Sequence, residues 1–174
     1  LLQLYAEKGE AMLQDLRGMY AFALWDARKN ALLLARDPFG IKPLYYTPSN
    51  GTLRFASQVK ALVAGGQIDT TPEPAGHVGF FLWGSVPAPF TLYRGIRALP
   101  AGHVMWVNEQ GVATPQPFCL ITEILAEASN NPARGTRGDA LDAIGAAMRD
   151  SIAAHHIADV PVAMFLSAGI DSAL

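Results

Sequence analysis

The chain has 174 residues, of which 51% are hydrophobic, so it can bury the core of one domain and part of another. Its net charge of −2 provides no positive field for nucleic acid or anionic lipid, so we expect neither partner. No apolar run reaches the roughly 18 residues of a membrane span, and a lone cysteine, Cys119, excludes an internal disulfide. These features predict a soluble protein of the reducing cytoplasm.

Three further features limit the chemistry. We interpret Cys119 as a partly buried small residue rather than as a nucleophile, because no strong base lies near it in the sequence. The histidines and the cysteine form no cluster at metal-ligand spacing. The chain begins with Leu1 in what reads as the middle of a helix, so we expect it to be a fragment of a longer polypeptide.

The first third of the chain predicts short helices followed by β-hairpins. Helical spacing of apolar residues over residues 1–8 ends at Gly9, and a second helical piece covers residues 11–16. Apolar runs then alternate with polar turns, which is the pattern of antiparallel strands. Ser57 is the expected N-cap of a helix over residues 58–63. The predicted strands are residues 19–25, residues 31–35, the stretch before a turn at residues 49–51, and residues 52–56.

Arg36 and Asp37 open a loop that two prolines and a glycine make rigid. They could act as catalytic charges, or they could form an ion pair or hydrogen bonds that brace the turn. We favour the structural interpretation, because such a tight loop needs partners for its backbone groups.

The middle of the chain predicts fewer regular elements. Residues 76–83 form an apolar stretch that suggests a short helix, with Phe80, Phe81 and Trp83 expected in the core. A strand is predicted at residues 103–107, and after a turn Val112 starts the returning strand. Pro115 and Pro117 are expected to end regular structure, residues 121–129 to be helical and residues 130–138 to form a flexible linker.

A longer helix should follow, with Asp139 as its cap. Its apolar positions recur at helical spacing and predict a face that lies against a strand near the end of the chain. These positions are Leu141, Ile144, Ala147, Met148 and Ile152.

The last fifteen residues predict a strand, a small-residue loop and the first turn of a helix. The apolar run 162–166 has the composition of a strand buried on both faces of a parallel sheet. The loop Ser167-Ala168-Gly169 carries little side-chain bulk, and residues 170–174 begin the helix. Such a corner directs free backbone N–H groups and a helix dipole at one point, which suits a phosphate group.

Asp171 and Ser172 refine this prediction. A carboxylate can hold the magnesium ion that accompanies a nucleotide, and a hydroxyl can donate to a phosphate oxygen. No lysine follows the loop, so it differs from the phosphate loop of enzymes that transfer the γ-phosphate. The string Ser167-Ala168-Gly169-Ile170-Asp171-Ser172 resembles the Ser-Gly-Gly-x-Asp-Ser pyrophosphate loop of ATP pyrophosphatases, with Ala168 in place of a glycine. The alternative is that the string is only a loop and a helix cap.

Several motifs, taken in order, resemble glutamine-hydrolysing asparagine synthetases. Residues 16–26, 35–46 and 55–62 are similar to the later half of the glutaminase domain of that family. Residues 87–103 resemble the segment that closes that domain, and residues 159–162 resemble the approach to the pyrophosphate loop. The resemblance covers nearly the whole chain and is weakest over residues 113–138. Gln58, Ala101 and Ala168 depart from the residues that are common in the family.

The resemblance implies an α+β fold. Residues 1–114 would be the C-terminal part of a glutamine amidotransferase domain, an antiparallel sandwich of the N-terminal-nucleophile type. Residues 115–138 would be a linker. Residues 139–174 would start an α/β nucleotide-binding synthetase domain with a parallel sheet, of which the chain holds the first strand, loop and helix.

The same resemblance implies the chemistry. In the family an N-terminal cysteine hydrolyses glutamine, and the ammonia passes through the protein to a β-aspartyl adenylate made from aspartate and ATP. Because this chain begins with Leu1, we expect none of its residues to be catalytic, and the fragment alone to be inactive. We expect ATP with Mg²⁺ as the cofactor, glutamine and aspartate as further ligands of the intact protein, and possible homodimers.

The implied nucleotide contacts fall on the terminal loop. Backbone groups of Phe165 or Leu166 would contact adenine, and Asp171 would lie near the magnesium ion. The pyrophosphate would lie among Ser167, Ala168, Gly169, Ile170, Asp171 and Ser172.

Three functions stay open on the sequence alone. The first is an amidotransferase that makes asparagine or an amide of a related carboxylate. The second is a β-lactam-forming synthetase that closes a ring without ammonia. The third is a degenerate structural or interaction module without catalysis, which is favoured if Ala168 blocks nucleotide binding.

Overall fold

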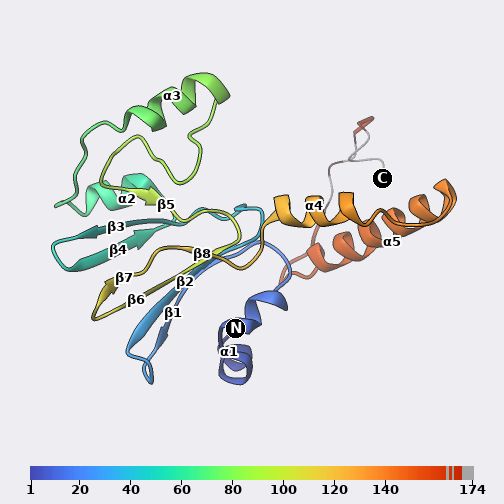
Figure 1. Ribbon diagram of the computed structural model, residues 1–174, viewed down its shortest axis with the longest axis horizontal. Helices are drawn as coiled ribbons and strands as arrows, with labels where there is room; N and C mark the ends of the chain where they lie inside the picture. Colours follow the sequence, from blue (N-terminus) through green and yellow to red (C-terminus); the bar gives the residue numbers. More distant parts are fainter. Residues whose placement is uncertain (164, 166, 170–174) are drawn as a thin grey trace. The chain divides into compact units, whose positions relative to one another are not determined.

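The computed structural model describes residues 1–163, 165 and 167–169, and the chain divides into two compact units, Leu1–Asn130 and Asn131–Leu174. The first unit contains helices and two antiparallel sheets (Figure 1). Its helical elements are α1 (Leu2–Lys8), the 3-10 helix η1 (Gly9–Gln14), α2 (Val59–Ala64), α3 (Pro74–Trp83) and α4 (Ile121–Asn130). Its strands are β1 (Ala21–Asp26), β2 (Ala31–Arg36), β3 (Tyr45–Ser49), β4 (Thr52–Ala56), β5 (Arg97–Ala98), β6 (His103–Asn108), β7 (Gly111–Val112) and β8 (Gln116–Pro117).

The sheets confirm the predicted hairpins. The larger sheet has the order β1-β2-β6-β7, with β8 also paired to β6, and the smaller sheet has the order β4-β3-β5. Every pairing among the described strands is antiparallel. The first hairpin turns tightly because the carboxylate of Asp26 accepts the backbone N–H groups of Arg28 and Lys29 at 2.9 and 3.2 Å. The antiparallel α+β part of the predicted fold is therefore present.

Strand β2 is covered on both faces, and this places the core. Successive side chains of a strand point to opposite faces, so Leu33 and Leu34 enter different clusters. Leu33 packs with Tyr5 and Met12 of α1 and η1, which cover one face of the larger sheet. On the other face Leu34 packs with Met105 of β6 and with partly buried residues of β3 and β4, so the two sheets share a core.

The structure corrects three local predictions in the first unit and adds one strand that was not predicted. The N-cap of α2 is Gln58 rather than Ser57, and its side chain makes no capping hydrogen bond. Strand β5 has only two residues and has no sequence pattern that could predict it. Strand β8 includes Pro117, which was expected to end regular structure; a proline is tolerated there because a strand at the sheet edge needs no second partner.

The third correction concerns α3. Phe80, Phe81 and Trp83 were expected in the core, but they are 49%, 84% and 75% exposed. The helix instead buries Gly76 and Gly79. Its close contact with the rest of the unit is made by the residues that have no side chain.

In the second unit the structure describes one helix, α5 (Arg137–His155). Its N-cap is Thr136 rather than Asp139. The two residues form a capping box, in which the Thr136 hydroxyl accepts the N–H of Asp139 and the Asp139 carboxylate accepts the N–H of Thr136. These hydrogen bonds hold the pKa of the Asp139 carboxyl below its usual value. The predicted apolar face is exposed at Leu141 and Ile144, and no residue of α5 is buried.

Candidate functional site

The terminal loop, the predicted nucleotide site, is described only in part. Val162, Ala163 and Phe165 lie in no helix or strand and are exposed, so a buried strand is not observed at these positions. Met164 and the predicted site residues Leu166, Ile170, Asp171 and Ser172 lie outside the described residues. A strand of a parallel sheet takes its hydrogen bonds from neighbouring strands, and the described residues contain no parallel pair that it could join.

Ser167, Ala168 and Gly169 form an exposed bend. The hydroxyl oxygen of Ser167 accepts the backbone N–H of Gly169 at 3.2 Å. This is the local hydrogen bond of a serine turn, and it agrees with the prediction that the segment is a small-residue loop. The predicted contacts of this loop with ATP stay a prediction.

The loop after β2 brings Arg36 to three carbonyl groups. Its guanidinium donates from Nε to Lys42 at 2.8 Å and from the two terminal nitrogens to Leu99 and Gly40 at 2.7 Å each. The rigid planar fork of arginine suits such a set of fixed acceptors. Arg36 therefore ties the loop to the strand that precedes it and to the chain before β6.

Asp37 holds the same loop from the inside. Its side chain is buried and accepts the backbone N–H groups of Phe39, Ile41 and Lys42 at 3.0 to 3.1 Å. Burial acts to raise the pKa of this carboxyl, but the backbone hydrogen bonds outweigh burial and hold it below its usual value. Arg36 and Asp37 thus brace the turn by hydrogen bonds, as the structural interpretation predicted.

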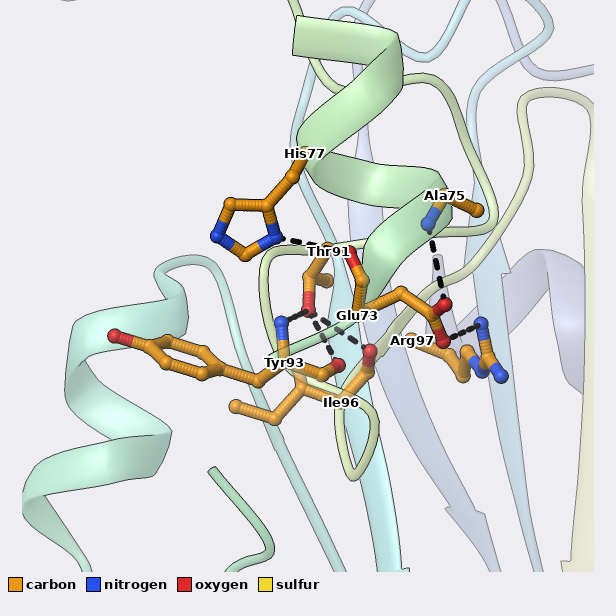
Figure 2. Close-up of polar contacts among 7 residues, drawn as sticks. All are labelled: Glu73, Ala75, His77, Thr91, Tyr93, Ile96 and Arg97. Carbon is orange, nitrogen blue, oxygen red and sulfur yellow. Dashed lines mark hydrogen bonds and ion pairs between the residues drawn. The ribbon is translucent and has the colours of Figure 1, made fainter. Parts of the chain in front are cut away.

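A second polar cluster joins the start of α3 to β5 (Figure 2). The carboxylate of Glu73 caps the helix by accepting the N–H of Ala75, and it lies 3.5 Å from a terminal nitrogen of Arg97. The guanidinium of Arg97 also lies over the ring of Phe90, with 5.3 Å to the ring centroid. Glu73 and Arg97, which are 24 positions apart in the sequence, therefore hold each other in place at the N-terminal end of α3. Sequence analysis missed this cluster, although Glu73 followed by Pro74 is a typical helix start.

Thr91 completes the cluster. Its buried hydroxyl lies 2.9 and 3.0 Å from the carbonyl oxygens of Tyr93 and Ile96 and accepts the N–H of Tyr93. The side chain of His77 is hydrogen-bonded through Nδ1 to the carbonyl of Glu73 at 2.9 Å. Thr91 and His77 bind backbone groups, and Glu73 pairs with Arg97, so this cluster, called the latch below, has a structural role.

A cavity of about 350 Å³ lies beside this latch, near the lower limit for small-molecule sites. Two of its polar lining residues are Arg36 and Thr91, whose polar atoms are engaged by carbonyl groups. We therefore assign no reaction to the cavity. Its lining residues are Arg36, Tyr45, Val59, Val86, Ala88, Phe90, Thr91, Leu92, Tyr93 and Ala98.

The described residues contain no group of three or more His, Cys, Asp or Glu side chains placed to hold a metal ion. None of the helices described is both long enough and apolar enough to cross a bilayer.

Comparison with protein families gives two matches in one chain. Residues 1–119 match the glutamine amidotransferase domain family, and residues 143–174 match the asparagine synthase family. The first match covers more than half of the chain. The two matches follow each other in the order that the sequence motifs predicted.

Named relatives agree with both matches. Asparagine synthetase [glutamine-hydrolyzing] 1 of Bacillus subtilis is 35% identical over 173 residues, or 99% of this chain and 26% of its own length. Asparagine synthetase B [glutamine-hydrolyzing] of Escherichia coli is 32% identical over 175 residues, or 100% of this chain and 25% of its own length. A Mycobacterium tuberculosis protein, named provisionally as a glutamine-hydrolysing asparagine synthetase, is 37% identical over 171 residues, or 97% of this chain and 26% of its own length.

The chain thus spans about a quarter of the length of the curated relatives it matches. Within that quarter the antiparallel sheets, the braced loop after β2 and the terminal small-residue loop all lie in matched segments. The chain belongs to the glutamine amidotransferase domain family, and its residues 143–174 are similar to the asparagine synthase family, as its relatives named glutamine-hydrolysing asparagine synthetases also indicate.

Proposed function

We propose that this chain is part of an ATP-dependent enzyme that converts aspartate to asparagine with ammonia from glutamine. The observation that supports this most strongly is the presence of both family segments, in order, in one chain. An amidotransferase segment alone would fit many ammonia-using enzymes, and the asparagine synthase segment narrows the acceptor to a carboxylate. The names of the relatives favour asparagine formation over the ring-forming alternative.

We place the domain boundary within residues 115–138; the amidotransferase match reaches residue 119, and the asparagine synthase match begins at residue 143. On this proposal residues 1–114 belong to an N-terminal-nucleophile-type amidotransferase domain, residues 115–138 link the domains and residues 139–174 begin the synthetase domain. The amidotransferase part is supported by the packed antiparallel sheets. We also expect the enzyme to work in the cytoplasm, with ATP, aspartate and glutamine as its ligands.

The proposed nucleotide contacts lie in the terminal loop. Ser167, Ala168 and Gly169 give a backbone that can approach a pyrophosphate closely, because none of them carries a bulky side chain. The amides of residues 170–172 would donate to it, and backbone groups of Phe165 or Leu166 would contact adenine. Bound Mg²⁺ would neutralise phosphate charge, and the carboxylate of Asp171 is the oxygen ligand of the kind this ion prefers.

The test uses the whole polypeptide encoded by the gene, with two activities measured side by side. The substitution Asp171→Ala should lower ATP-dependent asparagine formation by about a hundredfold or more, because a charged ligand of the nucleotide complex is lost. Glutamine hydrolysis should stay within about twofold, since its chemistry lies elsewhere. Asp142→Ala, on the exposed surface of α5, is the matched control and should leave both rates unchanged.

Two outcomes would contradict the proposal. Unchanged asparagine formation in the Asp171→Ala enzyme would remove the nucleotide role of the loop. Absence of asparagine formation in the wild-type polypeptide, with glutamine hydrolysis intact, would exclude asparagine synthesis itself. A parallel test of Ala168→Gly should leave ATP binding equal to that of the wild type or tighter, because loss of the methyl group lets the backbone approach the pyrophosphate at least as closely.

A further inference from the structure

A second cavity, of about 320 Å³, lies between the smaller sheet and the start of β6. Tyr46 of β3 and Arg97 of β5 are directly opposite each other in the antiparallel register, so their side chains lie on the same face of that sheet. On β6, His103 lies on the same face as Met105, two positions further on, and Met105 belongs to the core cluster that Tyr46 also contacts. Three polar side chains from the two sheets therefore line one cavity.

Arg97 has hydrogen-bond donors that the protein does not use. Its Nη1 atom is buried and lies 3.5 Å from the carboxylate of Glu73 without making a hydrogen bond (Figure 2). Its Nε and Nη2 atoms have no hydrogen-bond partner within the part of the chain that the structure describes. These two nitrogens share one edge of the guanidinium, and such an edge matches the two oxygens of a carboxylate. The stacking of the guanidinium on Phe90 fixes the plane in which a carboxylate would lie.

Tyr46 provides a further donor. Its hydroxyl has no hydrogen-bond partner among the residues described. Burial raises the pKa of Tyr46, while the charge of Arg97 acts in the opposite direction. The hydroxyl therefore keeps its proton at neutral pH and lies within the electric field of the guanidinium. The cavity thus contains a cation and a neutral donor next to each other.

The charge of the cavity favours a monoanion. Glu73 offsets part of the charge of Arg97, so a phosphate dianion would lack a second cation. His103 in its neutral form does not supply one. Its Nδ1 donates to the carbonyl of Ala101 at 2.7 Å, which leaves an acceptor as its other ring nitrogen. The rest of the lining is apolar and suits a short carbon chain; it consists of Pro89, Pro100 and Pro115.

We propose that this cavity is a binding site for a small carboxylate, held by the Nε and Nη2 atoms of Arg97 and by the hydroxyl of Tyr46. The carbon chain of the ligand would lie against the three prolines. Because Arg97 also pairs with Glu73, the ligand would connect the N-terminal end of α3 with the two sheets. This inference does not depend on the proposed catalytic function, since it involves no residue of the terminal loop.

Titration of the ¹⁵N-labelled 174-residue chain with sodium propionate, followed by NMR at about pH 8, tests the proposal. Sodium chloride at the same ionic strength is the reference for general salt effects. The amide signals of Tyr46, Arg97 and His103 should shift and saturate, with a dissociation constant in the millimolar range that a ligand of this size can reach. Sodium phosphate should bind about fivefold more weakly or not at all, because the cavity has only one cation.

Three variants separate the site from general effects on folding. Tyr46→Phe removes a hydroxyl that no described protein group uses, so the fold should persist while the dissociation constant for propionate rises about tenfold. Tyr45→Phe is the matched control, because Tyr45 is the neighbouring residue on β3 and lines the cavity beside the latch instead. Arg97→Lys keeps the charge but loses the planar edge, and it should weaken binding about tenfold or more. Circular dichroism and the urea midpoint show whether each variant is folded.

Several results would overturn the proposal. One is the absence of a saturable shift with propionate, and another is tighter binding of phosphate than of propionate. Unchanged affinity in Tyr46→Phe, or in a folded Arg97→Lys chain, would exclude the two proposed contacts. Equal weakening in Tyr45→Phe and Tyr46→Phe would show that the effect does not come from this cavity.

Discussion

The two units of the chain differ in how they obtain a core. In Leu1–Asn130 each strand lies beside a partner that is close in the sequence or returns to the same sheet, and β2 is covered on both faces. In Asn131–Leu174 the described residues include a well-capped helix, α5, but none of them is buried. Both segments have apolar residues at suitable spacing. The difference shows that regularly spaced apolar residues do not by themselves bury one side of a helix or strand. A second helix or strand must pack against that side.

The difference agrees with the kind of strand that the sequence predicts for each segment. Antiparallel strands can be joined by short turns, so the first segment can satisfy its backbone hydrogen bonds locally. Parallel strands need crossover connections of a dozen or more residues, so a strand at residues 162–166 would need partners from more distant chain. The first unit should therefore unfold as one cooperative body, and α5 should behave as a helix of low stability.

The largest expected effect is in the first unit, at Gly102. This residue has φ of 65°, and a Cβ atom there would lie 1.9 Å from the carbonyl oxygen of Cys119. Gly102→Ala should cost more than about 3 kcal/mol of unfolding free energy, because a backbone group must move. Gly66→Ala is the control: Gly66 has φ of 70° with open space around it, so only about 1 to 2 kcal/mol is expected. If urea unfolding gave the same loss of unfolding free energy for Gly102→Ala and Gly66→Ala, the close contact of Gly102 with Cys119 would not contribute to the effect.

The loop after β2 gives the next effect. Asp37→Ala removes a buried carboxylate that accepts three partly buried hydrogen bonds from backbone N–H groups, so we expect a loss of about 3 kcal/mol. Asp15→Ala removes only an exposed ion pair to Lys8 and should cost less than about 1 kcal/mol. Because the folded pKa of Asp37 lies below its unfolded value, its contribution is present above about pH 4 and is lost as pH falls. If the difference in unfolding free energy between the wild type and Asp37→Ala were as large at pH 2 as at pH 7, this explanation would be wrong.

A smaller effect is expected between α1 and β1. The hydroxyl of Tyr5 donates to Asp26 at 2.8 Å, and burial together with this bond raises the pKa of Tyr5 from 10.0 to about 12. The raised pKa means that this contribution is present below pH 10 and is lost as pH rises towards 12. Tyr5→Phe should lower the urea midpoint at pH 7 by less than Asp37→Ala, since Asp26 keeps two backbone donors. The variant should also lose less stability than the wild type between pH 10 and 12, and equal losses would contradict the assignment.

The smallest effect should fall in the second unit. Thr136→Ala removes the cap of α5 and should cost about 1 kcal/mol of local helix stability. Hydrogen exchange in the first turn of α5 should become faster, while the urea transition of the first unit should not move. Ser151→Ala, in the last turns of the same helix, is the control and should leave the first turn unchanged. A shift of the main urea transition in Thr136→Ala would show that the two units unfold together.

The parts of the fold that the sequence could predict are those defined by local chemistry. The hairpins followed from polar turns such as Asp26 to Asn30, and the bracing role of Arg36 and Asp37 followed from a loop rich in proline and glycine. Strand β5 could not be predicted, because two residues contain no period. The aromatic side of α3 was wrongly placed in the core, because hydrophobicity does not reveal that glycines make the closer contact.

The candidate nucleotide site shows another limit of sequence reasoning. Its residue types indicate phosphate and magnesium chemistry, but a site of this kind acts through the direction of several backbone N–H groups. The residues that would fix this direction, Leu166 and residues 170–172, lie outside the described residues. Residue types and order therefore gave the family, and the loop geometry stays a prediction.

The stem of the α3 segment has a consequence for how this family can diverge. Three backbone hydrogen bonds join the two ends of segment 69–95: the N–H groups of Gly95, Arg94 and Glu73 donate to the carbonyls of Asp69, Thr71 and Leu92. These bonds form before the chain enters β5. Insertions or deletions between residues 73 and 92 therefore need not disturb the register of β3 with β5. Relatives could therefore differ in the length and surface of segment 69–95 while the sheets beneath it stay the same.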